Sequence, residues 1–274
     1  MILNYINING NITSDNAARL PIDNGAFRYG YGLFETILVA GGEIALRQFH
    51  LQRLLAGLQL LQLDLPKLMT NGLFEEQVLP TVKKNGLENL CRVRLQVFAG
   101  GGGLYGPENN KSGFVIECFP LQPETLKLNE NGLVMGIAAG LNKSTDTFAN
   151  LKSCNALIYA MAARQAKDNK WNDALVCNTR GNIIESTIAN IFWIKNEEIF
   201  TPPLTEGCIA GVMRRYITEK LPVTEKSLHI DELLTADEVY LTNAIKKIKW
   251  VGEIGNIKYD NKQIKRLNDL LFVA

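Results

Sequence analysis

The 274-residue chain is poor in the residues that mark metal-binding and disulfide-rich proteins. It has only two histidines, His50 and His229, and no paired Cys-x-x-Cys, which argues against a zinc site. Its five cysteines are odd in number and scattered mostly within hydrophobic runs, a pattern typical of reduced core thiols. We therefore expect neither a metal site nor a disulfide framework.

The sequence also lacks long runs of basic residues and long runs of apolar residues. The 29 basic and 28 acidic residues nearly cancel and form no long basic run, so a nucleic-acid or anionic membrane surface has little support. No apolar stretch approaches the length of a membrane span, and the start MILNYINING lacks the features of a secretion signal. We expect a cytoplasmic protein that binds a small molecule and neither nucleic acid nor a membrane.

What the chain does contain is an ordinary globular composition, 46% hydrophobic and 21% charged, at a length that predicts two domains or one large one. An Asn-Gly turn predicts a hairpin over 1–12. Leucines at helical spacing predict a helix from His50 to Leu63. Further strands and helices are expected over 33–46, 72–85, 91–100 and 113–121.

The second half is richer in strand patterns. The polar segment 122–132 is the best linker candidate, which divides the chain into an N-terminal domain of residues 1–121 and a C-terminal domain of residues 133–274. Helices are expected after Lys152, after Gly211 and at the C-terminus, among several strands. The order predicts an α+β protein.

A lysine and an acid point to one chemistry. Lys152 stands where a polar lead-in meets a run of helical spacing, and Glu185 lies near the start of the second hydrophobic run of a strand-turn-strand pattern. An acid there requires a cationic or hydrogen-bonding partner. A lysine can form a Schiff base with an aldehyde cofactor, and a carboxylate can keep a pyridine nitrogen protonated. From these two residues alone, a solvated lysine and an acid paired with an arginine remain the commoner interpretation.

A cofactor phosphate would need positive charge and backbone N–H donors. Arg53 shares a helix face with His50 and could supply the charge, although it could equally extend from an amphipathic helix into solvent. Gly207 and Gly211 precede a helix beginning near Val212, whose first amides could face a phosphate, or Gly211 could be a simple cap. The glycines at 100–103 lack the strand-to-helix context of a nucleotide-binding motif.

Six segments in order carry a family resemblance: DNGAFRYGYGLFETI, FHLQRL, LKSCN, GNIIESTIANIFWI, GCIAGVMRRYI and EVYLTNAI. Together they resemble the signature of the class IV pyridoxal phosphate-dependent aminotransferases, which include branched-chain and D-amino acid aminotransferases and aminodeoxychorismate lyase. The resemblance covers nearly the whole chain. It implies fold type IV, with a smaller N-terminal α/β domain, a larger C-terminal β-barrel-like domain with helices, and pyridoxal 5'-phosphate in the cleft between them. It also implies a homodimer.

The resemblance assigns roles residue by residue. Lys152 falls at the Schiff-base lysine, Glu185 at the acid beside the ring nitrogen, and Arg53 at the phosphate arginine. The amides of Val212 and Met213 fall at the helix start that faces the phosphate. Two asparagines complete the implied cofactor contacts, Asn190 and Asn243.

Within the family, we favour aminodeoxychorismate lyase, which converts 4-amino-4-deoxychorismate to 4-aminobenzoate and pyruvate in the folate pathway. Met213 stands where many aminotransferases have threonine, and Leu241–Ala244 lacks their Ser/Thr-rich triplet. The alternatives are an amino acid aminotransferase, of branched-chain rather than D-amino acid type, and a non-catalytic binding protein. Ala99 replaces an arginine common in relatives, which leaves five candidate substrate contacts: Arg28, Tyr29, Phe34, Arg92 and Arg94.

Overall fold

The computed structural model describes residues 4–66, 68, 72–102, 105 and 111–272, and it divides into two compact units. The first unit comprises Met1–Thr125 together with Leu151–Asn155, and the second comprises Leu126–Asn150 and Ala156–Ala274. The border after Thr125 falls inside the segment 122–132, where the chain forms a short 3-10 helix, Pro123–Leu126. Half of the glycine-rich stretch 100–107 lies outside the described residues.

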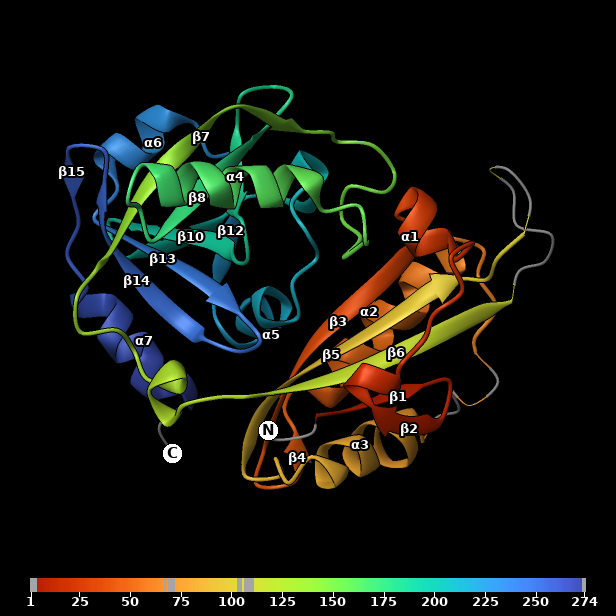
Figure 1. Ribbon diagram of the computed structural model, residues 1–274. Coiled ribbons are helices and arrows are strands. Elements are labelled where there is room, and N and C mark those ends of the chain that lie inside the picture. The colour runs from red at the N-terminus through yellow and green to blue at the C-terminus, as the bar shows by residue number, and fades with distance from the viewer. Residues whose placement is uncertain (1–3, 67, 69–71, 103–104, 106–110, 273–274) are drawn as a thin grey trace. The chain divides into compact units, whose positions relative to one another are not determined.

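The first unit is built on a six-stranded antiparallel sheet with the strand order β2-β1-β6-β5-β3-β4 (Figure 1). The predicted Asn-Gly turn is confirmed: Asn9 and Gly10 have φ angles of 52° and 88°, the left-handed values that a tight hairpin requires. The strands are β1 (Tyr5–Ile8), β2 (Asn11–Ser14), β3 (Gly32–Ala40), β4 (Glu43–Ile44), β5 (Leu90–Ala99) and β6 (Ser112–Pro120).

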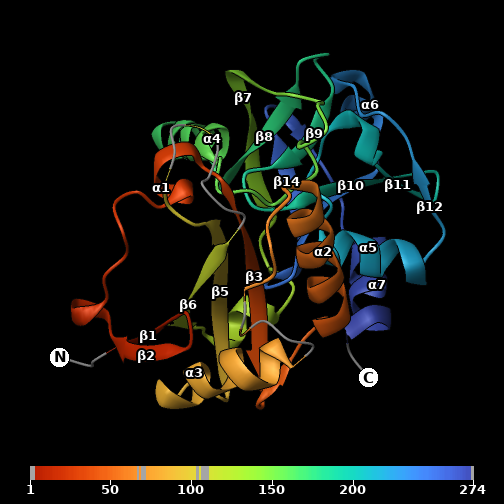
Figure 2. The same ribbon diagram turned by 90° about the vertical axis from the view of Figure 1, so that its right-hand side faces the viewer.

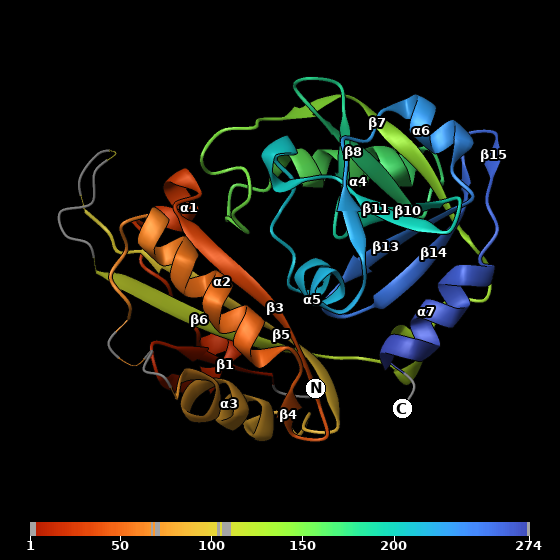
Figure 3. The same cartoon turned by 180° about the vertical axis from the view of Figure 1, so that it is seen from behind.

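Helices cover one face of this sheet, and alternate residues of its long strand β5 point to that face and are apolar. Val93, Leu95 and Val97 of β5 are fully buried in the core that includes α2 (Arg47–Leu60), which Figure 3 shows lying over the sheet alongside β3. The opposite face carries polar residues, among them Arg92 and Arg94. The predicted helix over 72–85 consists of a π-helical turn, Phe74–Val78, followed by α3, Leu79–Lys84. A short helix, α1 (Gly25–Tyr29), precedes β3.

The second unit contains a closed ring of six strands in the order β10-β13-β14-β7-β8-β9, closed by the pairing of β9 with β10. Its β14–β7 and β7–β8 pairs are parallel and the others are antiparallel. The strands are β7 (Leu133–Lys143), β8 (Asp173–Asn178), β9 (Ile183–Ser186), β10 (Asn190–Lys195), β13 (Glu238–Asn243) and β14 (Lys247–Ile254).

Short strands and helices surround the ring. From β10 the sheet continues through β11 (Glu198–Thr201) and β12 (Val223–Glu225), as Figure 2 shows, and β15 (Ile257–Lys258) pairs with β14. Helix α4 (Leu157–Asp168) packs on β7 and β8. The other helices are α5 (Val212–Lys220), α6 (Ile230–Thr235) and α7 (Lys262–Phe272).

Four of the ring strands, β8, β9, β10 and β13, are buried along nearly their whole length, and NIFWIK of β10 and EVYLTN of β13 are accordingly rich in apolar residues. Trp193, Val239 and Val251 lie inside one core, each at most 1% exposed. The predicted α+β class is therefore confirmed, with a barrel-like second unit. Across the described parts of both units, no helix combines the length and apolar character needed to cross a membrane.

Candidate active site

Lys152 lies in an extended segment that pairs with the N-terminal sheet. The backbone N–H of Phe34 in β3 donates to the carbonyl oxygen of Lys152 at 2.9 Å, and that of Cys154 donates to the carbonyl oxygen of Gly32 at 2.9 Å. Helix α4 begins only at Leu157. Strand-like pairing therefore fixes the main chain of Lys152, and the helix boundary expected there lies further along the chain.

Two glycines of the YGYG motif permit this close pairing. Gly30 ends α1 with a φ of 67°, and a Cβ placed on it would lie 3.1 Å from the Cβ of Asn155. A Cβ on Gly32 would lie 2.6 Å from the carbonyl oxygen of Val97 and 3.1 Å from the Cys154 sulfur. The carbonyl oxygen of Val97 is the nearest of these atoms, and because it belongs to the backbone of a paired strand it cannot move aside without disturbing the sheet. Glycine at these positions therefore lets the lysine segment approach β3.

The amine of Lys152 shares an aromatic ring with a second cation. Its Nζ lies 4.3 Å from the centroid of the Phe34 ring, and the guanidinium carbon of Arg94 lies 3.9 Å from the same centroid. Arg94 also donates a hydrogen bond from Nη2 to Oε1 of Gln96 at 2.8 Å. Burial lowers the pKa of Arg94, and the charge of Glu117 partly offsets that effect. Two cations gathered at one ring form a place suited to an anionic group.

Arg53 is held by a buried carboxylate, Glu35, whose side chain is 2% exposed. Arg53 donates from Nε to Oε1 at 2.8 Å and from Nη2 to Oε2 at 2.5 Å, and Nδ1 of His50 lies 2.6 Å from Oε2. Burial alone would raise the pKa of Glu35, but the charge and hydrogen bonds of Arg53, with help from His50, lower it to about 2. The bidentate pair fixes the direction of the guanidinium.

In the second unit, Glu185 is equally buried and accepts hydrogen bonds from three different elements. Nζ of Lys143, at the end of β7, and the hydroxyl of Tyr159, in α4, both donate to Oε1, at 2.8 and 2.6 Å. The backbone N–H of Ile209 donates to Oε2 at 2.9 Å. The expectation that this acid needs a cationic or hydrogen-bonding partner is confirmed.

The start of α5 is open to an anion. Its first residues are Val212 and Met213, and no side chain caps the helix within the described residues. Asn190 donates from Nδ2 to the carbonyl oxygen of Ile209, and its Oδ1 would lie 1.9 Å from a Cβ on Gly211. A Cβ at position 211 would therefore displace the side chain of Asn190 where the chain turns into α5. Uncapped amides at a helix start attract negative charge such as a phosphate.

The other predicted residues have mainly local contacts. Asn243 accepts from the backbone N–H groups of Ile245 and Lys246, so its side-chain oxygen stabilises the turn between β13 and β14. The guanidinium of Arg92 lies 4.4 Å from the Phe119 ring centroid. Arg28 and Tyr29 are exposed residues of α1.

Together, these residues match the chemical groups of pyridoxal 5'-phosphate, the cofactor implied by the sequence. Lys152 offers an amine to the aldehyde, Arg53 and the α5 amides offer positive charge to the phosphate, and Glu185 offers a carboxylate to the ring nitrogen. Two observations support this match: α5 lacks a side-chain cap, and the three donors to Glu185 leave one acceptor position on Oε2. Glu185, Val212 and Met213 belong to the second unit, and Lys152 and Arg53 to the first.

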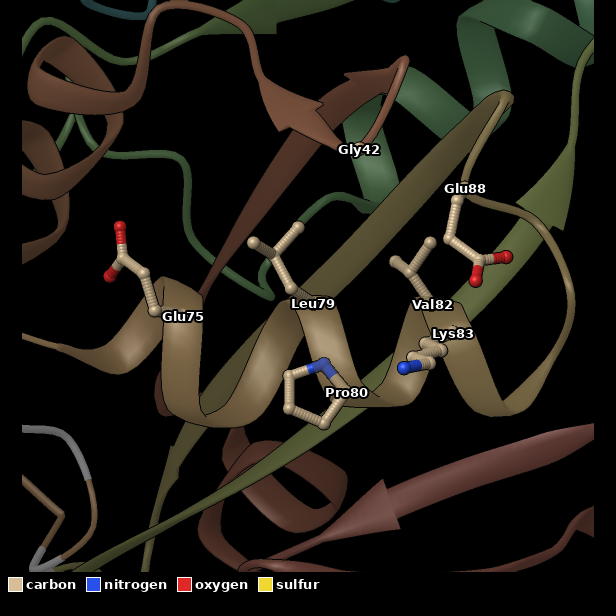
Figure 4. Close-up of a pocket in the computed structure, with 7 residues that line it drawn as sticks. All are labelled: Gly42, Glu75, Leu79, Pro80, Val82, Lys83 and Glu88. Atoms are coloured by element: carbon tan, nitrogen blue, oxygen red, sulfur yellow. The ribbon is translucent and has the colours of Figure 1, made fainter.

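A surface pocket in the first unit has a different character (Figure 4). It has a volume of about 270 Å³, and none of the predicted site residues lines it. Its walls are formed by Gly42, Glu75, Leu79, Pro80, Val82, Lys83 and Glu88. The described residues contain no group of three or more His, Cys, Asp or Glu side chains that could hold a metal ion.

Sequence reasoning missed Glu35, Lys143 and Tyr159. Glu35 had the same signal as Glu185, since it is an acid inside the hydrophobic run LFETILVA. Lys143 and Tyr159 left no local signal, because each meets Glu185 only through the tertiary fold.

Comparisons with known proteins show the family and the fold of the chain. The family model described as "Amino-transferase class IV" matches residues 32–254. The chain is 30% identical to an aminodeoxychorismate lyase of Bacillus subtilis, over 94% of this chain and 89% of that protein. Its fold is similar to a branched-chain amino acid aminotransferase of Escherichia coli, with a TM-score of 0.86, 22% identity and coverage of 98% and 94%. It also resembles a 4-amino-4-deoxychorismate lyase of Pseudomonas aeruginosa, with a TM-score of 0.82, 25% identity and coverage of 93% and 95%.

Proposed function

This chain belongs to the class IV amino-transferase family of pyridoxal phosphate-dependent enzymes, and we propose that it acts as an aminodeoxychorismate lyase. The substrate would be 4-amino-4-deoxychorismate and the products 4-aminobenzoate and pyruvate. The observation that carries this choice is the 30% identity to the Bacillus subtilis lyase over 94% of the chain. Met213 and the segment Leu241–Ala244, which depart from the aminotransferase pattern, support it.

The chain's own residues would hold the cofactor and move protons around it. Bound pyridoxal phosphate supplies an electron sink for the reacting carbon of an amino substrate. Lys152 would attach the cofactor through Nζ, and the released amine would take and return a proton at the substrate carbon. Glu185 would keep a proton on the ring nitrogen. Arg53 and the amides of Val212 and Met213 would hold the phosphate.

Two asparagines have smaller proposed roles. Asn190 would act by shaping the start of α5, because it bonds to Ile209 beside Gly211. Asn243 would border the cofactor from the turn that its own side chain stabilises.

The proposed substrate must carry two carboxylates, because each of its two products carries one. Arg94 has the best position to bind one of them, since it lies at the Phe34 ring that also contacts the amine of Lys152. It would replace the arginine that relatives have where this chain has Ala99. Arg92, Arg28 and Tyr29 remain further candidates for substrate contact.

A branched-chain amino acid aminotransferase is the second candidate. It is favoured by 29% identity to a "Putative branched-chain-amino-acid aminotransferase" of Methanocaldococcus jannaschii, over 97% of this chain and 93% of that protein. The same residues would hold the same cofactor in both cases. The two functions differ in one requirement, because an aminotransferase needs a keto acid to accept the amino group and a lyase does not.

We also propose that the chain works as a homodimer. Ile22 and Phe27, close together in sequence before and within α1, are 73% and 75% exposed, which is costly for side chains of this size in water. A second copy of the chain could cover them.

Product analysis with and without a keto acid acceptor tests the proposed reaction. The purified protein, loaded with pyridoxal phosphate, would be mixed with 4-amino-4-deoxychorismate, and pyruvate and 4-aminobenzoate would be measured. We expect both products in equal amounts without an acceptor. No release of pyruvate from 4-amino-4-deoxychorismate, together with formation of glutamate from leucine and 2-oxoglutarate, would overturn the lyase in favour of an aminotransferase. The Lys152→Ala variant, expected to be inactive and to lack the yellow colour of the loaded protein, is the control for the cofactor.

A further inference from the structure

The carboxylate of Glu185 has one acceptor position left. A carboxylate offers about four lone-pair positions, two on each oxygen. Lys143 and Tyr159 take both positions of Oε1, and the Ile209 amide takes one position of Oε2. All three neighbours donate hydrogen bonds to Glu185. They therefore suit a charged carboxylate, which can only accept hydrogen bonds. The remaining position, on Oε2, is where a further N–H donor can bind.

Tyr159 is well suited to fill Oε1 permanently. Burial, followed by the charge of Glu185 and their hydrogen bond, raises the pKa of Tyr159 well above its ordinary value, so the phenol remains a donor. Its hydrogen bond to Oε1 is short, 2.6 Å, as expected for a hydroxyl donating to a charged oxygen. Nζ of Lys143 lies 5.3 Å from the centroid of the same ring, so phenol and ammonium support each other.

We infer that Tyr159 is a positioning residue for the cofactor: with Lys143 it occupies Oε1 of Glu185 and thereby leaves Oε2 as the oxygen that binds the ring nitrogen. Tyr159 acts through Glu185 and not by its own contact with the ring. The inference rests on the proposed cofactor role of Glu185. If Tyr159 had only a structural role, it would pack α4 against β7 and β8. Its loss would then weaken the binding of every ligand of the site equally.

The ring nitrogen itself provides the test. In a 1-deaza analogue of pyridoxal 5'-phosphate, a carbon replaces the ring nitrogen while the aldehyde and phosphate stay. We would measure dissociation constants of both ligands for the full-length wild-type protein and for Tyr159→Phe, which removes only the hydroxyl. We expect Tyr159→Phe to raise the dissociation constant of pyridoxal phosphate by about tenfold, as for loss of one charge-assisted hydrogen bond. The dissociation constant of the analogue should rise by less than about twofold.

Two further variants make the result specific. Lys143→Met should show the same selective loss, and it serves as the second variant if Tyr159→Phe folds poorly by circular dichroism. Tyr240→Phe is the matched control, because Tyr240 is a buried tyrosine of the same unit whose hydroxyl has no hydrogen-bond partner among the described residues. It should change neither dissociation constant.

The possible outcomes separate the inference from the proposed function. Equal weakening of both ligands by Tyr159→Phe, or no weakening, would overturn the role of Tyr159 while leaving the cofactor site intact. If the wild-type protein binds neither ligand, or binds both with the same affinity, Glu185 does not serve the ring nitrogen. The assignment of Glu185 then fails together with the inference.

Discussion

The two units each contain a buried glutamate, and these two carboxylates differ in what they leave open. Glu35 and Glu185 are both 2% exposed, and both lie inside strands. Glu35 faces a single guanidinium that bonds both of its oxygens, with His50 beside it. Glu185 instead accepts single hydrogen bonds from an amine, a phenol and an amide that belong to three separate elements.

This difference shows how one residue type can serve two purposes. The bidentate pair with Arg53 makes Glu35 a support whose function is to direct a cation. The donors around Glu185 fix the carboxylate itself and leave one acceptor position on it. The first carboxylate is therefore expected to act through Arg53 on the cofactor phosphate, and the second to act directly on the cofactor ring.

The largest expected effect is on kcat, which should distinguish the role of Glu185 from that of Glu35. Glu185→Gln should lower kcat by about 10²–10³-fold at saturating cofactor, because the variant loses the charge that stabilises a protonated ring. Glu35→Gln should weaken cofactor binding by about tenfold through a less ordered Arg53, with kcat near wild type once the site is filled. Steady-state kinetics at a series of pyridoxal phosphate concentrations measures both. If the two variants lost kcat alike, the distinction between support and direct contact would fail.

An intermediate effect concerns acid stability. The pKa of Glu35 in the folded chain is about 2, below its ordinary value of 4.5. The ionised carboxylate therefore adds its full contribution to the free energy of unfolding above pH 4.5, and this contribution disappears as the pH falls toward 2. The unfolding free energy of the wild type should therefore lose about 3 kcal/mol more than that of Glu35→Gln across this range.

Urea unfolding followed by far-UV circular dichroism is the appropriate measurement, because all three tryptophans, at positions 171, 193 and 250, lie in the second unit. If the unfolding free energies of the wild type and of Glu35→Gln fell in parallel as the pH is lowered, Glu35 would not be the group that causes the extra loss of stability in acid.

The smallest effect comes from a second Arg–Glu pair, in which an arginine of α2 meets a glutamate of the π-helical turn Phe74–Val78. Arg47 bonds Glu75 at 2.8 Å, but their side chains are 37% and 51% exposed. Water screens such a pair, so Glu75→Gln should change the unfolding free energy by less than about 1 kcal/mol, and less still in high salt. Urea titrations at low and high salt would measure this. A cost as large as that of Glu35→Gln would mean that burial is not what distinguishes the two pairs.

Local patterns predicted most of the secondary structure. The Asn-Gly pair specifies the first hairpin because both of its residues accept left-handed backbone angles, and the leucine spacing indicates α2 within a few residues. The residues assigned by resemblance also lie on ordered elements, with Arg53 in α2 and Glu185 in β9. Their roles in binding remain predictions.

Long-range pairing was beyond the reach of sequence reasoning. The segment around Lys152 joins β3 through backbone hydrogen bonds to Gly32 and Phe34, and backbone pairing leaves no side-chain pattern. The division into units follows the same pairing, since it assigns Leu151–Asn155 to the first unit. Glu185 indicated that a partner was needed, but its donors come from residues 24 to 42 positions away in the sequence.

The anchoring of Lys152 on β3 also limits how its amine can move. With backbone hydrogen bonds at Lys152 and Cys154, the peptide chain on which the amine is carried stays in place. Any travel of Nζ must then come from rotation about the bonds of its own flexible four-carbon stem. Such rotations take picoseconds to nanoseconds, whereas loop rearrangements extend to microseconds. Motion of the lysine amine thus does not require the protein around it to rearrange.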